Sequence, residues 1–280
     1  MKGIFILIHF CSSGFLFAQN FKGVILDSAT NAPLPYVNIG IVGGNNGTVS
    51  NEQGVFELLI NPADTDTLRA SYIGYAPYTI SISEFRKHAS SVQLVIRMTQ
   101  RPVLLDEIVV KPLKGDLLTI GNRPGSKSVN ANFSTNMLGC EIGTRFTNNR
   151  LLIIDSVRLC IAKCLFDTIY LRVNIYKIDH GKFDQILKSP VYISLTRKEA
   201  LKKPVINITE HYAMVEGDFA VTIEIVRDLG EKKLAFYADL TDNVYPGIYR
   251  NTSQANWNFM KHKNKPAGIS LLAYTRSFEK

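Results

Sequence analysis

The stretch Gly47-Thr48-Val49-Ser50-Asn51-Glu52-Gln53-Gly54-Val55-Phe56 decides the fold of the first third of the chain. Its opening residues Thr48–Ser50 have strand composition, and the polar residues 51–54 form a turn in which Gly54 supplies a positive φ. The run 55–60 then alternates in the manner of a half-buried strand. These patterns predict two short strands joined by a polar glycine turn.

The same strand-and-turn spacing extends in both directions from this turn. Short alternating runs occupy 21–26, 36–41, 67–72, 78–82 and 92–98, and Gly, Pro, Asn or Asp separates them. Turn signals every 8 to 12 residues are typical of a β-sandwich. Helical periodicity is scarce, and the only helical candidate is Arg197–Leu201, about one turn. We therefore predict an all-β chain.

Four motifs in order give this first part a family resemblance. They are Lys22–Asp27, Ala32–Ile39, Gly47–Phe56 and Ser71–Tyr75. Together they resemble the carboxypeptidase regulatory-like domain, a transthyretin-like sandwich. The resemblance implies seven strands over residues 19–112 and a module that accompanies catalytic domains without itself being catalytic.

The segment Leu105-Asp106-Glu107-Ile108-Val109-Val110 follows this domain. It resembles the TonB box that follows the same domain in starch-utilisation-type TonB-dependent transporters. Those proteins continue into a plug and a large barrel, whereas about 170 residues follow here. A 22-stranded barrel at about 10 residues per strand does not fit into that length. Two interpretations stay open for Leu105–Val110: a last strand or linker, and a contact with TonB.

The N-terminus predicts export. Lys2, the apolar run 4–8 and Ala18 are typical of a secretory signal peptide over residues 1–18, cleaved before Gln19. A membrane anchor is the alternative, but His9 and the cluster 12–14 interrupt a stretch that would need about 20 apolar residues. A lipid on Cys11 is disfavoured by the bulky Phe10. With the transporter resemblance, export suggests the periplasm or outer membrane of a Gram-negative bacterium.

Charge separates the two halves of the mature chain. Residues 19–112 hold 7 Lys and Arg against 8 Asp and Glu, whereas residues 113–280 hold 24 against 16. A basic half suits anionic glycans, lipopolysaccharide, a membrane surface or nucleic acid, and export argues against nucleic acid. Scattered Lys and Arg on a solvated face are the open alternative.

The second half also consists of strands. Pro and Gly mark residues 113–127 as an interdomain linker, and residues 128–280 contain long apolar or alternating runs such as 151–165 and 169–178. These predict a second β-sandwich of jelly-roll type. Its three cysteines allow one disulfide, from Cys140 to Cys160 or Cys164, or three buried thiols. Cys160 and Cys164 would lie about 13 Å apart on one extended strand.

No catalytic residue, cofactor or metal site is predicted. His88, His180, His211 and His262 lack the His and Glu spacing of a zinc peptidase, and no Gly-x-Ser-x-Gly elbow or phosphate-binding glycine loop occurs. Paired carboxylates can come together in space without a sequence signature. The local acidic groups are Asp239 with Asp242, and Glu216 with Asp218.

Binding chemistry gathers between residues 245 and 259. Tyr249, Arg250, Asn256, Trp257 and Asn258 combine aromatic rings with amide and guanidinium donors, the pairing that holds sugars. Packing inside the sandwich is the alternative role for these aromatic residues.

Two functions follow from these patterns. The first is a non-catalytic exported envelope module that binds glycan or protein through its basic second domain. The alternative is a glycoside or peptide hydrolase whose site assembles only in space. A concave cluster of Asp, Glu or His in the second sandwich would favour the hydrolase.

Overall fold

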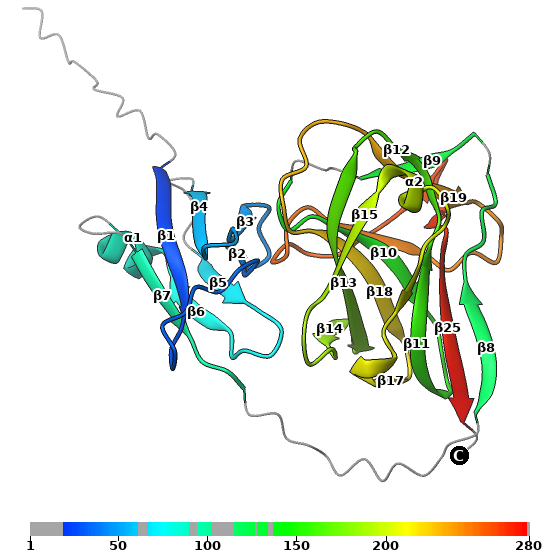
Figure 1. Ribbon diagram of the computed structural model, residues 1–280, viewed down its shortest axis with the longest axis horizontal. Coiled ribbons are helices and arrows are strands. Elements are labelled where there is room, and N and C mark those ends of the chain that lie inside the picture. The colour runs from blue at the N-terminus through cyan, green and yellow to red at the C-terminus, as the bar shows by residue number, and fades with distance from the viewer. Residues whose placement is uncertain are drawn as a thin grey trace, which may run out of the picture.

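The computed structural model describes residues 19–60, 66–89, 94–101, 115–126, 128–133 and 137–278. These residues form two bodies that lie side by side (Figure 1), each around a separate hydrophobic core. Strands dominate both bodies, so the all-β class is confirmed. The predicted signal peptide 1–18 and the segment Leu105–Val110 lie outside the described residues. Within the described residues, no helix is long and apolar enough to cross a bilayer.

The first body is a sandwich of seven strands in two sheets. One sheet has the order β4-β1-β7 and contains β1 (Gln19–Asp27), β4 (Val55–Ile60) and β7 (Leu94–Met98). The other has the order β3-β2-β5-β6 and contains β2 (Asn38–Ile41), β3 (Gly47–Val49), β5 (Thr67–Ser71) and β6 (Tyr78–Ser81). The alternation of β4 is realised, because Phe56, Leu58 and Ile60 are buried and Glu57 and Leu59 are exposed.

One helix in this body contradicts the expectation that Arg197–Leu201 is the only helical segment. Helix α1 (Ile82–Ala89) follows β6 and buries Ile82 and Phe85. The ring of Phe85 meets Phe21 edge-on at 5.1 Å between centroids. Two apolar residues three apart are too short a pattern to show helical periodicity, and packing against the sheet decides the conformation. The predicted turn is present as α2 (Arg197–Ala200), with a capping box from Thr196.

The second body is also a sandwich, with two layers that enclose the larger core. Its first layer is a seven-stranded sheet of order β14-β13-β18-β10-β20-β21, with β15 also paired to β13. These strands are β10 (Glu141–Phe146), β13 (Thr168–Asp179), β14 (Lys182–Gln185), β15 (Val191–Thr196), β18 (Phe219–Ile225), β20 (Gly247–Arg250) and β21 (Asn258–Phe259). Successive side chains point to opposite faces, so one face of this layer enters the core and the other turns outward.

The second layer consists of two smaller sheets. One contains β8 (Asp116–Gly121), β11 (Leu151–Leu159), β16 (Val205–Asn207), β17 (Ala213–Glu216) and β25 (Leu271–Phe278). The other contains β9 (Asn130–Phe133), β12 (Ile161–Cys164), β19 (Leu234–Asp239) and β24 (Gly268–Ile269). A hairpin of β22 (Lys261–His262) with β23 (Lys265–Pro266) and a 3-10 turn at Thr209–His211 complete the described elements.

Part of the predicted linker belongs to this layer. Residues 116–121 form β8, which pairs antiparallel with β25 along its whole length. Leu118 and Ile120 of this strand pack against the large core, whereas Leu117 is 85 % exposed. Of the Gly and Pro residues that suggested a linker, Gly121 ends this strand and the others lie outside it.

The thiols of Cys140, Cys160 and Cys164 are all buried, and none of them forms a disulfide. Of the two alternatives left open by the sequence, three buried thiols and one bridge from Cys140, the structure has the three buried thiols. Burial raises the pKa of the Cys160 thiol, which lowers its reactivity.

Candidate functional site

A row of four charged side chains crosses the outward face of the seven-stranded sheet. Arg172 on β13 is the cross-strand partner of Glu224 on β18, Glu224 of Glu141 on β10, and Glu141 of Arg250 on β20. Both carboxylates are fully buried, as is Arg172, and the Arg250 side chain is 12 % exposed. Like charges directly opposite each other destabilise a sheet. The two central glutamates therefore need the arginine on either side.

Hydrogen bonds within the row neutralise both acids. Arg172 donates from Nε and Nη2 to Glu224 Oε2 at 2.9 and 2.8 Å. Arg250 donates from Nε to Glu141 Oε1 at 2.9 Å and pairs with it again through Nη2. Asn174 Nδ2 lies between the acids, 2.6 Å from Glu224 Oε2 and 3.2 Å from Glu141 Oε2. The row is thus a closed, charge-balanced network.

One atom of the row stays outside this network. Glu224 Oε1 is buried and has no hydrogen-bond partner among the described residues. Burial raises the pKa of the Glu224 carboxyl; Arg172 acts against this shift, and the adjacent Glu141 adds to it. For Arg172, burial alone would lower the pKa, but the Glu224 carboxylate, Tyr192 and Tyr176 together raise it. Burial beside a second carboxylate therefore makes Glu224 easier to protonate than an exposed glutamate.

The first sandwich covers this row on one side through Tyr36. Arg172 Nη1 donates to the Tyr36 carbonyl at 2.8 Å, and the Tyr36 ring packs on Tyr170 and Tyr192 at 5.4 and 5.3 Å. Tyr36 has a φ of 58°, a left-handed conformation that costs a bulky residue on the order of 1 kcal/mol or more. Arg227 donates to the Tyr36 hydroxyl at 2.9 Å and pairs with Glu52. Contacts across the domain boundary hold the strained residue in place.

A second set of contacts joins the bodies beyond the row. Gly43 N donates to the Gln254 carbonyl at 2.9 Å, and Gln254 Nε2 donates to Ser71 Oγ at 2.8 Å. Gly47 fits only because it lacks a side chain, since a Cβ there would lie 2.8 Å from Thr252. The glycine turn 43–47 therefore docks on the segment 251–256.

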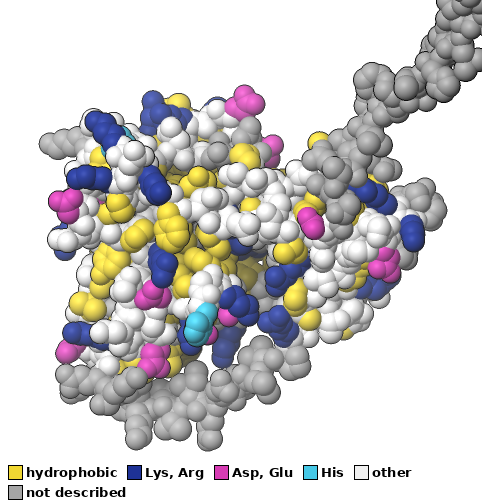
Figure 2. Space-filling view, turned by 180° about the vertical axis from the view of Figure 1, so that it is seen from behind, with side chains coloured by type: hydrophobic (Ala, Val, Ile, Leu, Met, Phe, Trp, Pro, Cys, Tyr) yellow, Lys and Arg dark blue, Asp and Glu magenta, His cyan; other side chains and the backbone are white. Residues whose placement is uncertain are grey.

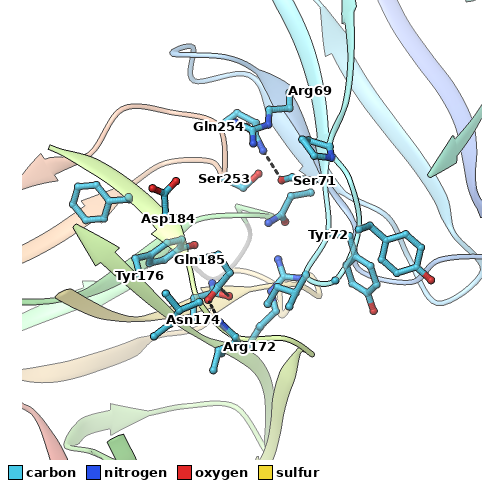
Figure 3. Close-up of a pocket in the computed structure, with 18 of the residues that line it drawn as sticks. Arg69, Ser71, Tyr72, Arg172, Asn174, Tyr176, Asp184, Gln185, Ser253 and Gln254 are labelled. Carbon is cyan, nitrogen blue, oxygen red and sulfur yellow. Dashed lines mark hydrogen bonds between the residues drawn. The ribbon is translucent and has the colours of Figure 1, made fainter. Parts of the chain in front are cut away.

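Between the two sets of contacts lies a cleft of about 570 Å³, which we call the interdomain cleft. Both bodies line it, and Figure 3 shows Arg69, Ser71 and Tyr72 on one wall facing Arg172, Asn174 and Tyr176 on the other. The further lining residues are Asn38, Ile73, Gly74, Tyr75, Pro77, Arg101, Phe183, Asp184, Gln185, Ile186, Leu187, Lys188, Arg250, Ser253 and Gln254. The volume is within the range of small-molecule sites.

Three polar atoms of this lining are buried without a partner among the described residues. They are Asn38 Oδ1 and Arg69 Nε from the first body and Ser253 Oγ from the second. Asn38 is 8 % and Ser253 4 % exposed. Leaving such a group unsatisfied costs about 1–3 kcal/mol. Three residues of the cleft lining thus hold one acceptor, one donor and one hydroxyl whose hydrogen-bonding capacity is unused.

Comparison with known families identifies the first body. Residues 21–110 match the model described as the CarboxypepD_reg-like domain. Residues 21–110 are a carboxypeptidase regulatory-like domain. This kind of domain is a non-catalytic β-sandwich module. A comparison of the chain with curated proteins gives no significant match.

Several residues of the motifs that identify the regulatory-like domain lie on the wall of the cleft. Asn38 belongs to the motif 32–39, and Ser71, Tyr72 and Tyr75 belong to the motif 71–75. The face of the β2 and β5 pair therefore turns toward the second sandwich. In this chain the domain supplies half of a cavity as well as a scaffold.

Trp257 packs among its neighbours on the second sandwich. Its ring stacks on Phe183 at 4.9 Å and meets Tyr176 edge-on at 5.7 Å. The guanidinium carbon of Arg250 lies 4.4 Å from the ring centroid. The ring has contacts on both faces, and its neighbour Arg250 lines the interdomain cleft.

The other predicted ligand residues lie elsewhere. Tyr249 points to the opposite face from Arg250 and lines a second cleft of about 560 Å³ with Phe259 and His262. Asn256 and Asn258 are exposed, and Asn258 Nδ2 donates to the Asn256 carbonyl at 3.2 Å. The five residues named from the sequence therefore do not form one surface.

The acidic residues considered for catalysis do not converge either. Asp218 pairs with Arg145 at 2.9 Å, Asp242 lies 3.8 Å from Lys265, and Asp239 accepts a backbone bond from Thr241. Among the described residues, no group of three His, Cys, Asp or Glu side chains could hold a metal ion.

One feature of the sequence indicates the charge row. Glu224 is the only charged residue in β18, whose seven residues are all buried. A lone charge inside an apolar strand indicates a buried partner. The alternation of β13 predicts a strand with one polar face, but alternation does not show that a second domain covers that face.

Proposed function

We propose that the chain is an exported, non-catalytic binding module whose ligand site is the interdomain cleft. The supporting observation is the set of unpartnered buried atoms Asn38 Oδ1, Arg69 Nε and Ser253 Oγ, contributed by both sandwiches to one cavity. Ligand sites occur preferentially at domain interfaces. The glycan or protein partner expected of an exported basic domain is therefore assigned to this boundary.

The charge row favours binding over hydrolysis. A hydrolase needs a carboxyl group that touches the substrate as acid, base or nucleophile. Glu141 and Glu224 are cross-strand neighbours, yet both are fully buried and engaged by arginine, Asn174 and Thr222. Their charge is used to position the arginines and not offered to a substrate.

A blocked cleft tests the proposal. Asp184 is exposed and lines the cleft. It forms an exposed ion pair with Lys182 at 3.1 Å. The variant Asp184→Trp should fill the opening and reduce binding of ligands found on a glycan array and in an envelope pull-down with the full chain. Asp179→Trp is the matched control, because Asp179 is an exposed acid at the end of β13 outside the cleft.

Each outcome decides the matter. Binding that Asp184→Trp weakens and Asp179→Trp preserves supports the cleft. Equal binding by both variants moves the site elsewhere, and blank array and pull-down results contradict the binding function. Hydrolysis of an array glycan or a peptide by the purified chain would overturn the non-catalytic assignment.

A further inference from the structure

The basic residues of the interdomain cleft fall into two groups. Arg172 and Arg250 are neutralised by Glu224 and Glu141. For Arg69, Arg101 and Lys188, no carboxylate of the described residues lies within ion-pair distance, although all three line the cleft. Figure 2 shows Lys and Arg side chains gathered where the two bodies meet. Against the three unneutralised cations the lining holds a single acid, Asp184.

Arg69 presents a specific edge to this space. It lies on β5 opposite Gly40, and Figure 3 places its guanidinium beside Gln254 at the wall of the cleft. Its buried Nε has no partner among the described residues. The Nε edge of a guanidinium is one of its two forks, and it binds a carboxylate through parallel hydrogen bonds. The unpartnered group is thus a ready site for a planar anion.

The unpartnered atoms near Arg69 are suited to hydrogen bonds with hydroxyl groups. Asn38 Oδ1 needs a donor, and Ser253 Oγ can donate or accept. Asn38 pairs with Ser71 across β2 and β5, two residues from Arg69 on the same face, so acceptor and cation lie close together. A hydroxyl both donates and accepts, which suits this mixed set. The rings of Tyr72 and Tyr75 add apolar faces to the same wall.

We infer that the interdomain cleft binds an acidic saccharide, with the carboxylate of a uronate unit on Arg69 and ring hydroxyls on Asn38 and Ser253. This inference rests on the proposed function and names its ligand class. Arg101 and Lys188 raise the local positive potential that draws the acid to the cleft. An acidic peptide could also offer carboxylates but lacks the closely spaced hydroxyls that the neutral lining atoms require.

The test compares matched ligands on the full chain by isothermal titration calorimetry. The probes are oligomers of galacturonate, glucuronate and mannuronate, the methyl esters of the same oligomers, and oligoglutamate as the peptide. Arg69→Gln removes the guanidinium charge of Arg69 from the cleft. Arg97→Gln is the control, because Arg97 is an exposed residue on β7 that does not line the cleft.

We expect at least one uronate oligomer to bind, with an affinity that falls as ionic strength rises. Esterification and Arg69→Gln should each weaken it roughly 10- to 100-fold, and Arg97→Gln should leave it unchanged. Circular dichroism of Arg69→Gln shows whether the variant is folded. If it is not, Arg101→Gln on the exposed side of the cleft takes its place, with a smaller expected loss.

Three results would overturn the inference. In the first, the methyl esters bind as tightly as the acids, and Asp184→Trp abolishes this binding. The cleft would then still be the binding site, but recognition of the uronate carboxylate would be contradicted. In the second, oligoglutamate binds more tightly than every uronate oligomer, and the ligand class would then be an acidic peptide and not a saccharide. No binding of any probe, with a blank glycan array, would remove the inference together with the proposed function.

Discussion

The variant Arg172→Met tests whether the buried charge row is held by paired charges. It keeps the aliphatic stem of the side chain but removes the donors to Glu224 at 2.9 and 2.8 Å and the donor to the Tyr36 carbonyl at 2.8 Å. The row then carries one unneutralised buried carboxylate. Removing one partner of a buried pair costs about 3–5 kcal/mol, a large share of the roughly 5–15 kcal/mol that stabilises a domain.

The chain contains its own probe for this experiment. Trp257 is the only tryptophan, and it contacts Arg250 at the end of the same row. Its fluorescence during urea unfolding therefore reports on the second sandwich. Lys182→Met on the neighbouring β14 is the control, because its partner Asp184 is exposed and such pairs contribute about 0–1 kcal/mol.

The double variant Arg172→Met/Glu224→Leu separates lost charge from lost packing. It leaves Arg250 and Glu141 as a balanced pair, so most of the stability should return. Protonation gives a second check. Without Arg172 the pKa of Glu224 rises further, so its stabilising proton is bound at low pH and lost as pH rises through that pKa. Arg172→Met should therefore be closer to wild type at pH 5 than at pH 8. A loss under about 1 kcal/mol, or a double variant as unstable as the single one, would refute the reasoning.

Two further predictions concern the frame around the cleft. Asp27 accepts bonds from the backbone of Thr30, the Tyr75 hydroxyl and the backbone of Ala29, which hold its pKa at about 2; its stabilisation should be complete above about pH 4 and fade as pH falls toward 2. Asp27→Asn should therefore lower the melting temperature at pH 7, as measured by circular dichroism. The melting temperature of the variant should also change less between pH 4 and pH 2 than that of the wild type. A variant whose melting temperature falls with acid as steeply as that of the wild type would contradict this prediction. Gly143→Ala places a Cβ 2.2 Å from the Val221 carbonyl oxygen and should destabilise the second sandwich by about 1–3 kcal/mol in the Trp257 assay, whereas Gly217→Ala, with open space around it, tests only the positive φ.

The sequence was sufficient where the signal is local. The turn at Gly54 and the alternation of β4 follow from residues close in the chain, and both sandwiches consist of such units. Helix α1 was missed because two buried residues three apart carry too little periodicity. Strand β8 was missed because its partner β25 is about 150 residues away. The cleft was missed for the same reason, since Asn38, Arg69 and Ser253 meet only after the two sandwiches dock.

The location of the effective charge also depends on docking. The excess of Lys and Arg lies in the second half of the chain, and this directed attention to its surface. Two arginines of that half that line the cleft are already neutralised by buried glutamates. Arg69 and Arg101, two of the three unneutralised cations there, come instead from the near-neutral regulatory-like domain. A formal count treats every lysine and arginine alike, whereas a ligand senses only charges that no carboxylate has compensated. The proposed specificity therefore depends on the boundary, where the first sandwich contributes Arg69 and Arg101, and the second contributes Lys188 beside two arginines that glutamates already neutralise.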